Sequence, residues 1–346
     1  MIDLIWNITR ICTWNCAICC VDAIQANSVS WNETLVNLER TKTELNLEEK
    51  MLVLQNLKSI NCKIDFSGGD PLGHPHTLVV LKEASSLFGR SNVTLTATGA
   101  TLVHSHFEEI LPLIGELNFT YDLPASRENH YRPLGYAKSN LLSVSTLRRN
   151  GLSIRAECPL TTWNTDDSAI EELYLELNNF GIDELLLMRM FPVGRGVLNS
   201  NIMLSADRYK KAISHFFNLE RIYRVPKIKL QCALRIFDST DNQTENPCDL
   251  LDNSLGLMPD GTLLASPWAY GVSGKPLGDE WVLGNLAKES IENILFSPKT
   301  QKYKKLLNKN FGHCKVFAWI FSKKTDGLQR IFDTTDPIVN ALTLSK

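Results

Sequence analysis

The chain has 346 residues, of which 44% are hydrophobic and 21% charged, and 38 acidic against 36 basic residues give a net charge of −2. This length supplies enough apolar material for one large domain or two smaller ones. The near balance of charge excludes an overall electrostatic footprint for nucleic acid or an anionic membrane. The sequence begins without the features of a secretory signal, and no stretch reaches the roughly 20 apolar residues of a membrane span. We therefore expect a cytoplasmic protein.

Short β-rich segments alternate with segments of helical apolar spacing through the first 200 residues. The predicted strands cover 2–8, 62–67, 92–98, 116–121, 153–158 and 184–190. The predicted helices between them cover 46–59, 77–88, 102–114, 138–150 and 166–180. Six strands interleaved with five helices are typical of an α/β fold with a parallel sheet. Right-handed crossovers would curl these units into a partial (β/α)6 barrel that resembles a TIM barrel, with ligands at the carboxyl ends of its strands.

The pattern changes after residue 196. The predicted elements there are a helix, a strand, a hairpin and two more helices, over 205–221, 227–231, 255–265, 287–295 and 298–309. The hairpin is indicated by Pro259, Asp260 and Gly261, which are turn residues between two apolar runs. We therefore expect a boundary near residue 200 and a smaller α+β extension behind it.

Four of the nine cysteines lie close together after the first strand, and Cys12, Cys16 and Cys19 have the spacing C-x3-C-x2-C. In a reducing compartment such a group is more typical of a metal site or catalysis than of disulfides. Thiolates select zinc or iron–sulfur clusters, and structural zinc normally takes four protein ligands. Three ligands would leave one iron of a cubane cluster open. Cys20 falls outside the spacing, and we expect it to be a spectator.

The position of this loop directly after the first strand puts it at the mouth of the sheet, where α/β enzymes keep their chemistry. The strand, the C-x3-C-x2-C loop and the βα repeats together resemble the radical S-adenosylmethionine (SAM) superfamily. The resemblance implies that Cys12, Cys16 and Cys19 hold a 4Fe–4S cluster whose open iron takes the amino and carboxylate groups of SAM. Reduction would then cleave SAM to a 5′-deoxyadenosyl radical, with flavodoxin or ferredoxin as the type of reducing partner.

Further segments fit the same resemblance in their order around the sheet. "FSGGDP" (66–71) looks like the family's GGE motif, in which Gly68 and Gly69 let the backbone approach a ligand closely. Asp70 stands where the family usually has Glu, and its carboxylate would receive the SAM ammonium. The other cofactor-binding residues that the resemblance implies are Ile18, Thr120, Asp122 and Asn164.

The C-terminal part resembles the SPASM/twitch extension, which carries auxiliary 4Fe–4S clusters in enzymes that modify peptides. Cys232, Cys248 and Cys314 surround its hairpin, but Ser266 stands where a ligand cysteine would be expected. Three cysteines cannot hold two clusters. This leaves a single auxiliary cluster on these cysteines plus one other ligand, or a degenerate domain whose cysteines are buried apolar residues.

The resemblance divides the chain into a radical SAM core over 1–200 and a cysteine-depleted SPASM/twitch-like domain over 201–346. We expect hydrogen abstraction from a peptide side chain or α-carbon. The alternatives are a radical SAM enzyme acting on a small molecule, such as a twitch-type dehydrogenase or a nucleoside-modifying enzyme, and a non-catalytic iron–sulfur or zinc protein. Cys158, at the end of the fifth strand, could face the barrel mouth and give a hydrogen atom to a substrate radical, with core packing as the alternative. Strand alternation and loop position suggest as pocket residues Asp122, Glu157, Arg189 and Trp268.

Overall fold

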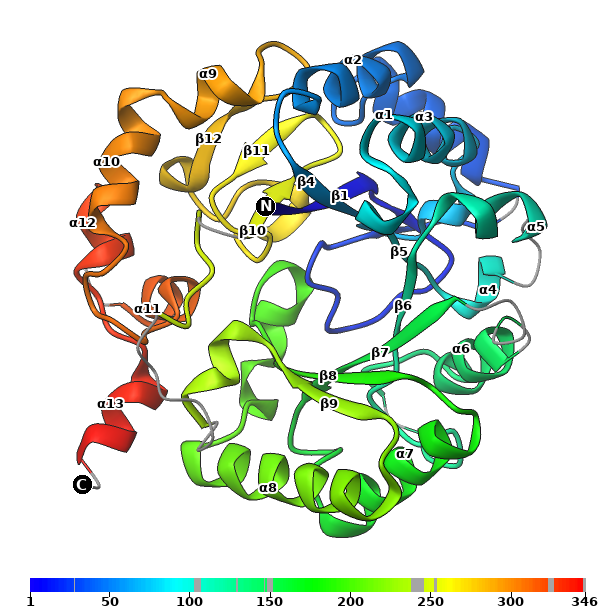
Figure 1. Cartoon of the computed structure of the whole chain (residues 1–346), viewed down its shortest axis with the longest axis vertical. Coiled ribbons are helices and arrows are strands. Elements are labelled where there is room, and N and C mark those ends of the chain that lie inside the picture. Colours follow the sequence, from blue (N-terminus) through cyan, green and yellow to red (C-terminus); the bar gives the residue numbers. More distant parts are fainter. Residues whose placement is uncertain are drawn as a thin grey trace.

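The computed structural model describes residues 1–27, 29–102, 107–128, 130–145, 147, 152–237, 246–251, 254–322 and 327–344. Its centre is a ten-stranded sheet with the strand order β12-β11-β10-β1-β4-β5-β6-β7-β8-β9. Figure 1 shows this sheet curving around the middle of the molecule, with the helices outside it. None of the helices described combines the length and the apolar composition that crossing a membrane requires.

The parallel part of the sheet confirms the predicted partial barrel. Its neighbouring strands pair in parallel and are β1 (Ile2–Thr9), β4 (Cys62–Gly68), β5 (Val93–Thr96), β6 (Glu116–Thr120), β7 (Ser153–Leu160), β8 (Glu184–Arg189) and β9 (Lys227–Leu230). The long helices that follow these strands are α2 (Leu47–Leu57), α3 (Thr77–Phe88), α6 (Tyr136–Ser145), α7 (Asp167–Asn179) and α8 (Ala206–Tyr223). All six strands predicted for the barrel are therefore present, and β9 extends their row.

Two predicted helices differ from the structure. The segment 102–114 contains the end of α4 (Gly99–Leu102) and the short helix α5 (Phe107–Ile110), while 103–106 lie outside the described residues. The helix predicted over 138–150 is α6, and 146 and 148–150 lie outside the described residues. Helix α1 (Trp31–Arg40) was not predicted, although its buried residues Trp31, Leu35 and Leu38 have helical spacing.

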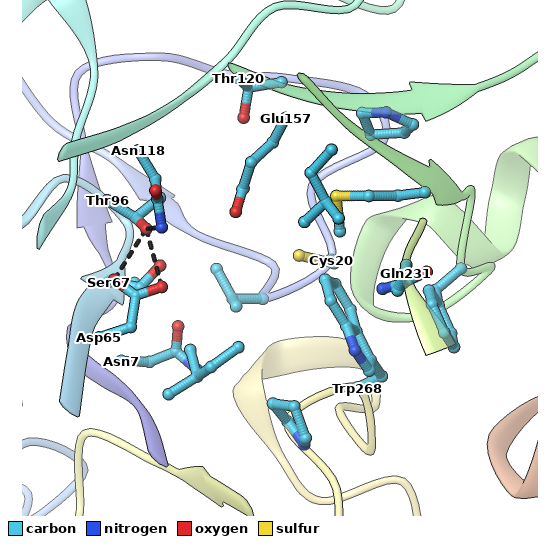
Figure 2. Close-up of a pocket in the computed structure, with 18 of the residues that line it drawn as sticks. Asn7, Cys20, Asp65, Ser67, Thr96, Asn118, Thr120, Glu157, Gln231 and Trp268 are labelled. Carbon is cyan, nitrogen blue, oxygen red and sulfur yellow. Dashed lines mark hydrogen bonds between the residues drawn. The ribbon is translucent and has the colours of Figure 1, made fainter. Parts of the chain in front are cut away.

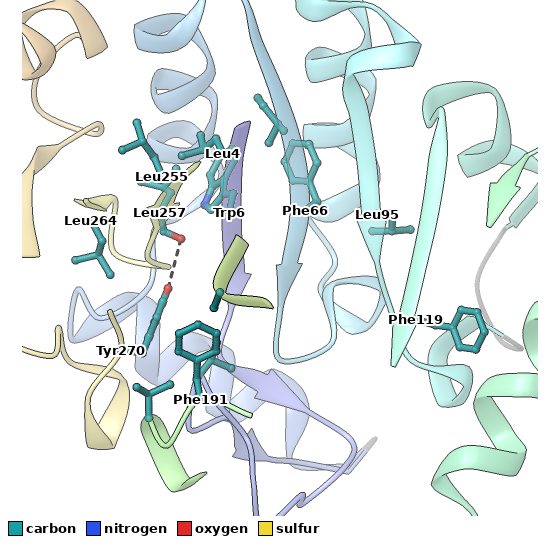
Figure 3. Packing of buried hydrophobic residues seen from close by; sticks show 14 of the residues in the cluster. Leu4, Trp6, Phe66, Leu95, Phe119, Phe191, Leu255, Leu257, Leu264 and Tyr270 are labelled. Atoms are coloured by element: carbon teal, nitrogen blue, oxygen red, sulfur yellow. Dashed lines mark hydrogen bonds between the residues drawn. The ribbon is translucent and has the colours of Figure 1, made fainter. Parts of the chain in front are cut away.

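Residues after 200 contribute strands at both ends of the sheet. The predicted hairpin is confirmed as β10 (Ser254–Leu257) and β11 (Thr262–Leu264), which pair antiparallel. Strand β10 also pairs in parallel with β1, and β12 (Val282–Asn285) follows β11 at the edge. Figure 3 shows Leu255 and Leu257 of β10 packed in one core with Trp6 of β1. The boundary near residue 200 stays a prediction, but the sheet itself runs across it.

The remaining elements are short. Strands β2 (Ile11–Cys12) and β3 (Ile24–Gln25) form a small parallel pair that holds the two ends of the cysteine loop together. The C-terminal helices are α9 (Ile291–Leu295), α10 (Pro298–Leu306), α11 (Lys315–Phe321), α12 (Gly327–Phe332) and α13 (Pro337–Leu344). Figure 1 shows them along the side of the molecule next to β10, β11 and β12.

A buried ion pair ties the C-terminal segment to the barrel. The guanidinium of Arg189, at the end of β8, donates to both carboxylate oxygens of Asp336, and both side chains are 1% exposed. The same guanidinium lies 3.4 Å from the ring centroid of Phe317 on α11. Since neither charge has access to water, each stabilises the fold only while the other is present.

We predict that Asp336→Ala lowers the free energy of unfolding by about 3–5 kcal/mol, because it leaves the Arg189 charge buried without its partner. Asp333→Ala is the matched control. It removes the partially exposed pair between Asp333 and Lys309 and should cost at most about 1 kcal/mol. Urea unfolding of the two variants and the wild type measures the difference, and equal losses would contradict the importance of the buried pair.

Candidate functional site

The predicted cysteine ligands come together at the mouth of the barrel. Cys12, Cys16 and Cys19 all line one cavity of about 390 Å³. A cavity of this volume is typical of sites for small molecules and cofactors. The main-chain N–H of Trp14 donates to Sγ of Cys12 at 3.4 Å, and that of Ala23 donates to Sγ of Cys19 at 3.3 Å. Hydrogen bonds of this kind to sulfur tune iron–sulfur centres.

The electrostatics of these thiols suit a positively charged centre. Burial raises the pKa of Cys12 and of Cys16, and for Cys16 the guanidinium of Arg132 opposes this rise. Thiolates at these positions therefore need a cation beside them, and a bound metal deprotonates a coordinating thiol outright. The donor set thus fits a metal centre.

Among the described residues, the only group of three or more His, Cys, Asp and Glu side chains whose ligand atoms all lie within 4.8 Å of one another is Glu39, His74 and His76. The sulfurs of Cys12, Cys16 and Cys19 therefore do not all lie within that distance of one another.

The glycine motif packs against the cysteine loop through the main chain. The N–H of Gly69 donates to the carbonyl of Thr9 at 2.8 Å, and the N–H of Asp70 donates to the carbonyl of Ile11 at 2.8 Å. A Cβ on Gly69 would stand 2.1 Å from the Ile11 oxygen, which leaves no room for any side chain. Gly68 and Gly69 both line the cavity, so the requirement for glycine follows from this close approach.

The structure places Asp70 outside the cavity lining, and its expected contact with the SAM ammonium stays a prediction. Its carboxylate is fully buried, accepts hydrogen bonds from the hydroxyls of Thr98 and Thr101, and is not among the cavity-lining groups. Burial raises its pKa to about 6, although the two threonines oppose the rise. Asp70 therefore holds the loop after β4 to the segment after β5, while the glycines before it face the cavity.

Ile18 and Thr120 line the cavity, whereas Asp122 and Asn164 do not. The carboxylate of Asp122 pairs with Arg132 at 2.6 Å, and Arg132 faces the cavity in its place. The Asn164 amide donates to the carbonyls of Asp122 and Pro159 at 2.8 and 2.9 Å. It thereby joins the ends of β6 and β7. In the structure their polar atoms hold the barrel mouth together, and the expectation that these two side chains contact SAM directly stays a prediction.

Cys158 does not face the barrel mouth, so that expectation is wrong. Alternate residues of a strand point to opposite faces, and in β7 the inward positions are Arg155, Glu157 and Pro159. Cys158 is fully buried in the core on the other face, where the Asn164 amide lies 3.8 Å from its sulfur. Glu157 and Cys158 are neighbours on one strand, so alternation alone showed that only one could line the cavity.

One wall of the cavity is polar. Figure 2 shows Glu157 and Thr120 above Asn118, Thr96 and Asp65, which come from successive strands. The hydroxyl of Thr96 donates to the Asp65 carboxylate at 2.8 Å. Burial raises the pKa of Asp65 to about 6, and burial together with the neighbouring Asp65 raises that of Glu157 to about 8. Glu157 therefore carries a proton at neutral pH.

The opposite wall is largely apolar. Trp268 lines it and stacks on Phe191, with ring centroids 4.6 Å apart. Arg189 also lines the cavity. The structure therefore confirms the cavity positions expected for Glu157, Arg189 and Trp268. Sequence reasoning missed Asp65, Thr96, Asn118 and Cys20, although the inward alternation of β4, β5 and β6 would have indicated the first three.

A second, much smaller cavity of about 30 Å³ lies behind this apolar wall. Its lining includes Cys232, Cys248 and Cys314, together with Ser266, the position where a ligand cysteine was expected. Burial raises the pKa of all three thiols. Cys232 lines the main cavity as well, so the two cavities share a wall.

The chain shares its overall fold with solved structures of two other proteins. Streptococcus suis SuiB bound to the precursor peptide SuiA superposes with a TM-score of 0.70 at 12% identity, over 97% of this chain and 75% of that chain. The anSMEcpe protein with bound AdoMet (SAM) and the Cp18Cys peptide gives a TM-score of 0.65 at 14% identity, over 99% and 95% of the two chains. No protein-family model and no curated protein matches the sequence.

We predict that Glu157→Gln stabilises the protein at pH 8 relative to the wild type. The folded-state pKa of Glu157 lies above its usual value of 4.5, so the folded state binds more protons than the unfolded state between pH 4.5 and about 8. Wild-type stability therefore falls across this window, and the amide removes that loss. Urea unfolding at pH 5 and pH 8 measures the effect, and a stability difference independent of pH would contradict it.

Proposed function

We propose that the protein is a radical SAM enzyme that modifies a peptide. The observation that carries this proposal is the set of three cysteines, spaced C-x3-C-x2-C, that line one cavity at the mouth of a barrel with the radical SAM fold. A 4Fe–4S cluster on Cys12, Cys16 and Cys19 would supply the electron that cleaves SAM to the 5′-deoxyadenosyl radical. A flavodoxin or ferredoxin would supply that electron in turn.

The chain's own residues would bind and orient SAM. Gly68 and Gly69 bring the main chain to the cavity surface, and Ile18 packs against Met190 at its edge. Thr120 adds a hydroxyl on the polar wall. Glycine backbone, an apolar side chain and a hydroxyl are matched to the polar and apolar parts of a nucleoside-containing cofactor.

The shape and chemistry of the cavity support a peptide as the substrate. Its polar wall offers carboxyl, hydroxyl and amide groups, and Trp268 provides a flat apolar surface opposite. An amino-acid residue with an apolar side chain combines the two matching parts, a polar main chain and an apolar group. The peptides in the SuiB and anSMEcpe structures further support this substrate class. Enclosure by these walls would keep water from a reactive radical.

We predict that Cys12→Ala abolishes both cluster assembly and SAM cleavage. The two thiolates that remain in the loop would leave a second iron of the cluster without a protein ligand. Cys62→Ala is the matched control, since Cys62 lies in the core at the start of β4, outside both cavities. Iron content after anaerobic reconstitution and 5′-deoxyadenosine produced from SAM under reduction are the measurements. Full SAM cleavage by Cys12→Ala would overturn the proposed function.

We also propose that Cys232, Cys248 and Cys314 hold an auxiliary 4Fe–4S cluster. Cys248 follows Cys232 by 16 positions and Cys314 follows Cys248 by 66, yet all three line one cavity, where Ser266 would be available as an oxygen ligand. Buried cysteines can also be plain apolar residues, but their gathering at one point favours a shared ligand.

Iron counting distinguishes these possibilities. We predict about eight iron atoms per reconstituted wild-type chain and about four for Cys248→Ala, because each cluster holds four. Cys62→Ala should retain the wild-type count. A wild-type value of about four would show that the second group of cysteines holds no cluster.

A further inference from the structure

Cys20 directly follows the last cysteine of the C-x3-C-x2-C loop, yet its side chain lines the main cavity. Figure 2 shows its sulfur pointing into the open space between Glu157 and Trp268. The sequence-based expectation that Cys20 is a spectator does not account for this position. Cys158, the thiol expected at the cavity, lies in the core instead.

The backbone at Cys20 is fixed by the loop after β8. The N–H of Arg195 donates to the Cys19 carbonyl at 3.0 Å, and a Cβ on Gly194 would stand 2.5 Å from the Cys20 carbonyl oxygen. Gly194 has a φ of +53°, a conformation that favours glycine. This hydrogen bond and this close packing hold the main chain at Cys20 against the loop after β8.

Two buried amide side chains that line the same cavity as Cys20 each have an unpaired polar atom. Within the described part of the chain, Nε2 of Gln231 and Oδ1 of Asn118 have no hydrogen-bond partner. Gln231 is 8% exposed and Asn118 2%, and both line the cavity that Cys20 lines. Buried polar atoms are nearly always paired, so these two point to a ligand with both an acceptor and a donor. A peptide group offers both.

We propose that Cys20 is a catalytic residue that gives a hydrogen atom to the substrate radical. This inference rests on the proposed function. The S–H bond of Cys20 breaks homolytically and a C–H bond forms at the substrate carbon, so the substrate radical is reduced and Cys20 is oxidised to a thiyl radical. One electron from a flavodoxin- or ferredoxin-type donor and one proton from water restore the thiol. The substrate thus keeps its oxidation level, as in an inversion of configuration.

The test needs no peptide, because SAM itself serves as the probe. In D2O the Cys20 thiol exchanges to S–D, and with no peptide in the cavity the 5′-deoxyadenosyl radical takes deuterium from it. Mass spectrometry of 5′-deoxyadenosine made by the reconstituted full chain with SAM and dithionite should show one deuterium. Cys20→Ala and Cys20→Ser should lose most of this label, and the matched control Cys158→Ala should retain it.

A second readout does not depend on turnover. Iodoacetamide should alkylate Cys20 in the reconstituted protein far faster than Cys158, and SAM should slow that labelling, because of these two thiols Cys20 alone lines the cavity. Iron content should be unchanged in Cys20→Ser. Loss of iron in that variant would make Cys20 a cluster ligand and overturn its role as hydrogen donor. Unlabelled 5′-deoxyadenosine from the wild type would overturn only the role of Cys20, whereas no 5′-deoxyadenosine would overturn the proposed function as well.

Discussion

The site depends on main-chain contacts between the cysteine loop and the loops that follow β4 and β8. Gly69 and Arg195 donate N–H groups to carbonyls at the two ends of the cysteine loop, and Gly69 and Gly194 stand where any Cβ would collide with that loop. These contacts are made by the main chain and involve no side chain. The cysteine loop is therefore held by the loops that follow two strands of the parallel sheet.

The curvature of the sheet decides how the cavity is divided. Strands β4 to β7 turn polar residues inward and apolar residues toward the helices, so one wall carries carboxyl, hydroxyl and amide groups. The opposite wall comes from loops, where Trp268 stacks on Phe191. Since Cys232 lines both cavities, a centre bound there would stand directly behind the wall that faces the substrate.

Comparison of the expected and observed site residues shows where sequence reasoning succeeded. The three cysteines, the two glycines, Ile18 and Thr120 all line the cavity. Each of them was inferred from its position in a local motif at or after the end of a strand. Asp70, Asp122 and Asn164 were placed by the same motifs, but their side chains bond to neighbouring segments. A motif indicates that a polar residue is needed at the end of a strand. It does not indicate whether that side chain contacts the ligand or forms hydrogen bonds with neighbouring segments of the protein.

The sequence by itself determined the fold class and the three-cysteine loop, because hydrophobic periodicity and ligand spacing are properties of residues a few positions apart. Only the tertiary structure decided that Cys20 lines the cavity and Cys158 does not, since the cavity is formed by segments from the whole chain. It also decided that Arg189 pairs with Asp336, 147 residues away, and that three dispersed cysteines meet. Such contacts between distant residues are set by packing, which leaves no local pattern in the sequence.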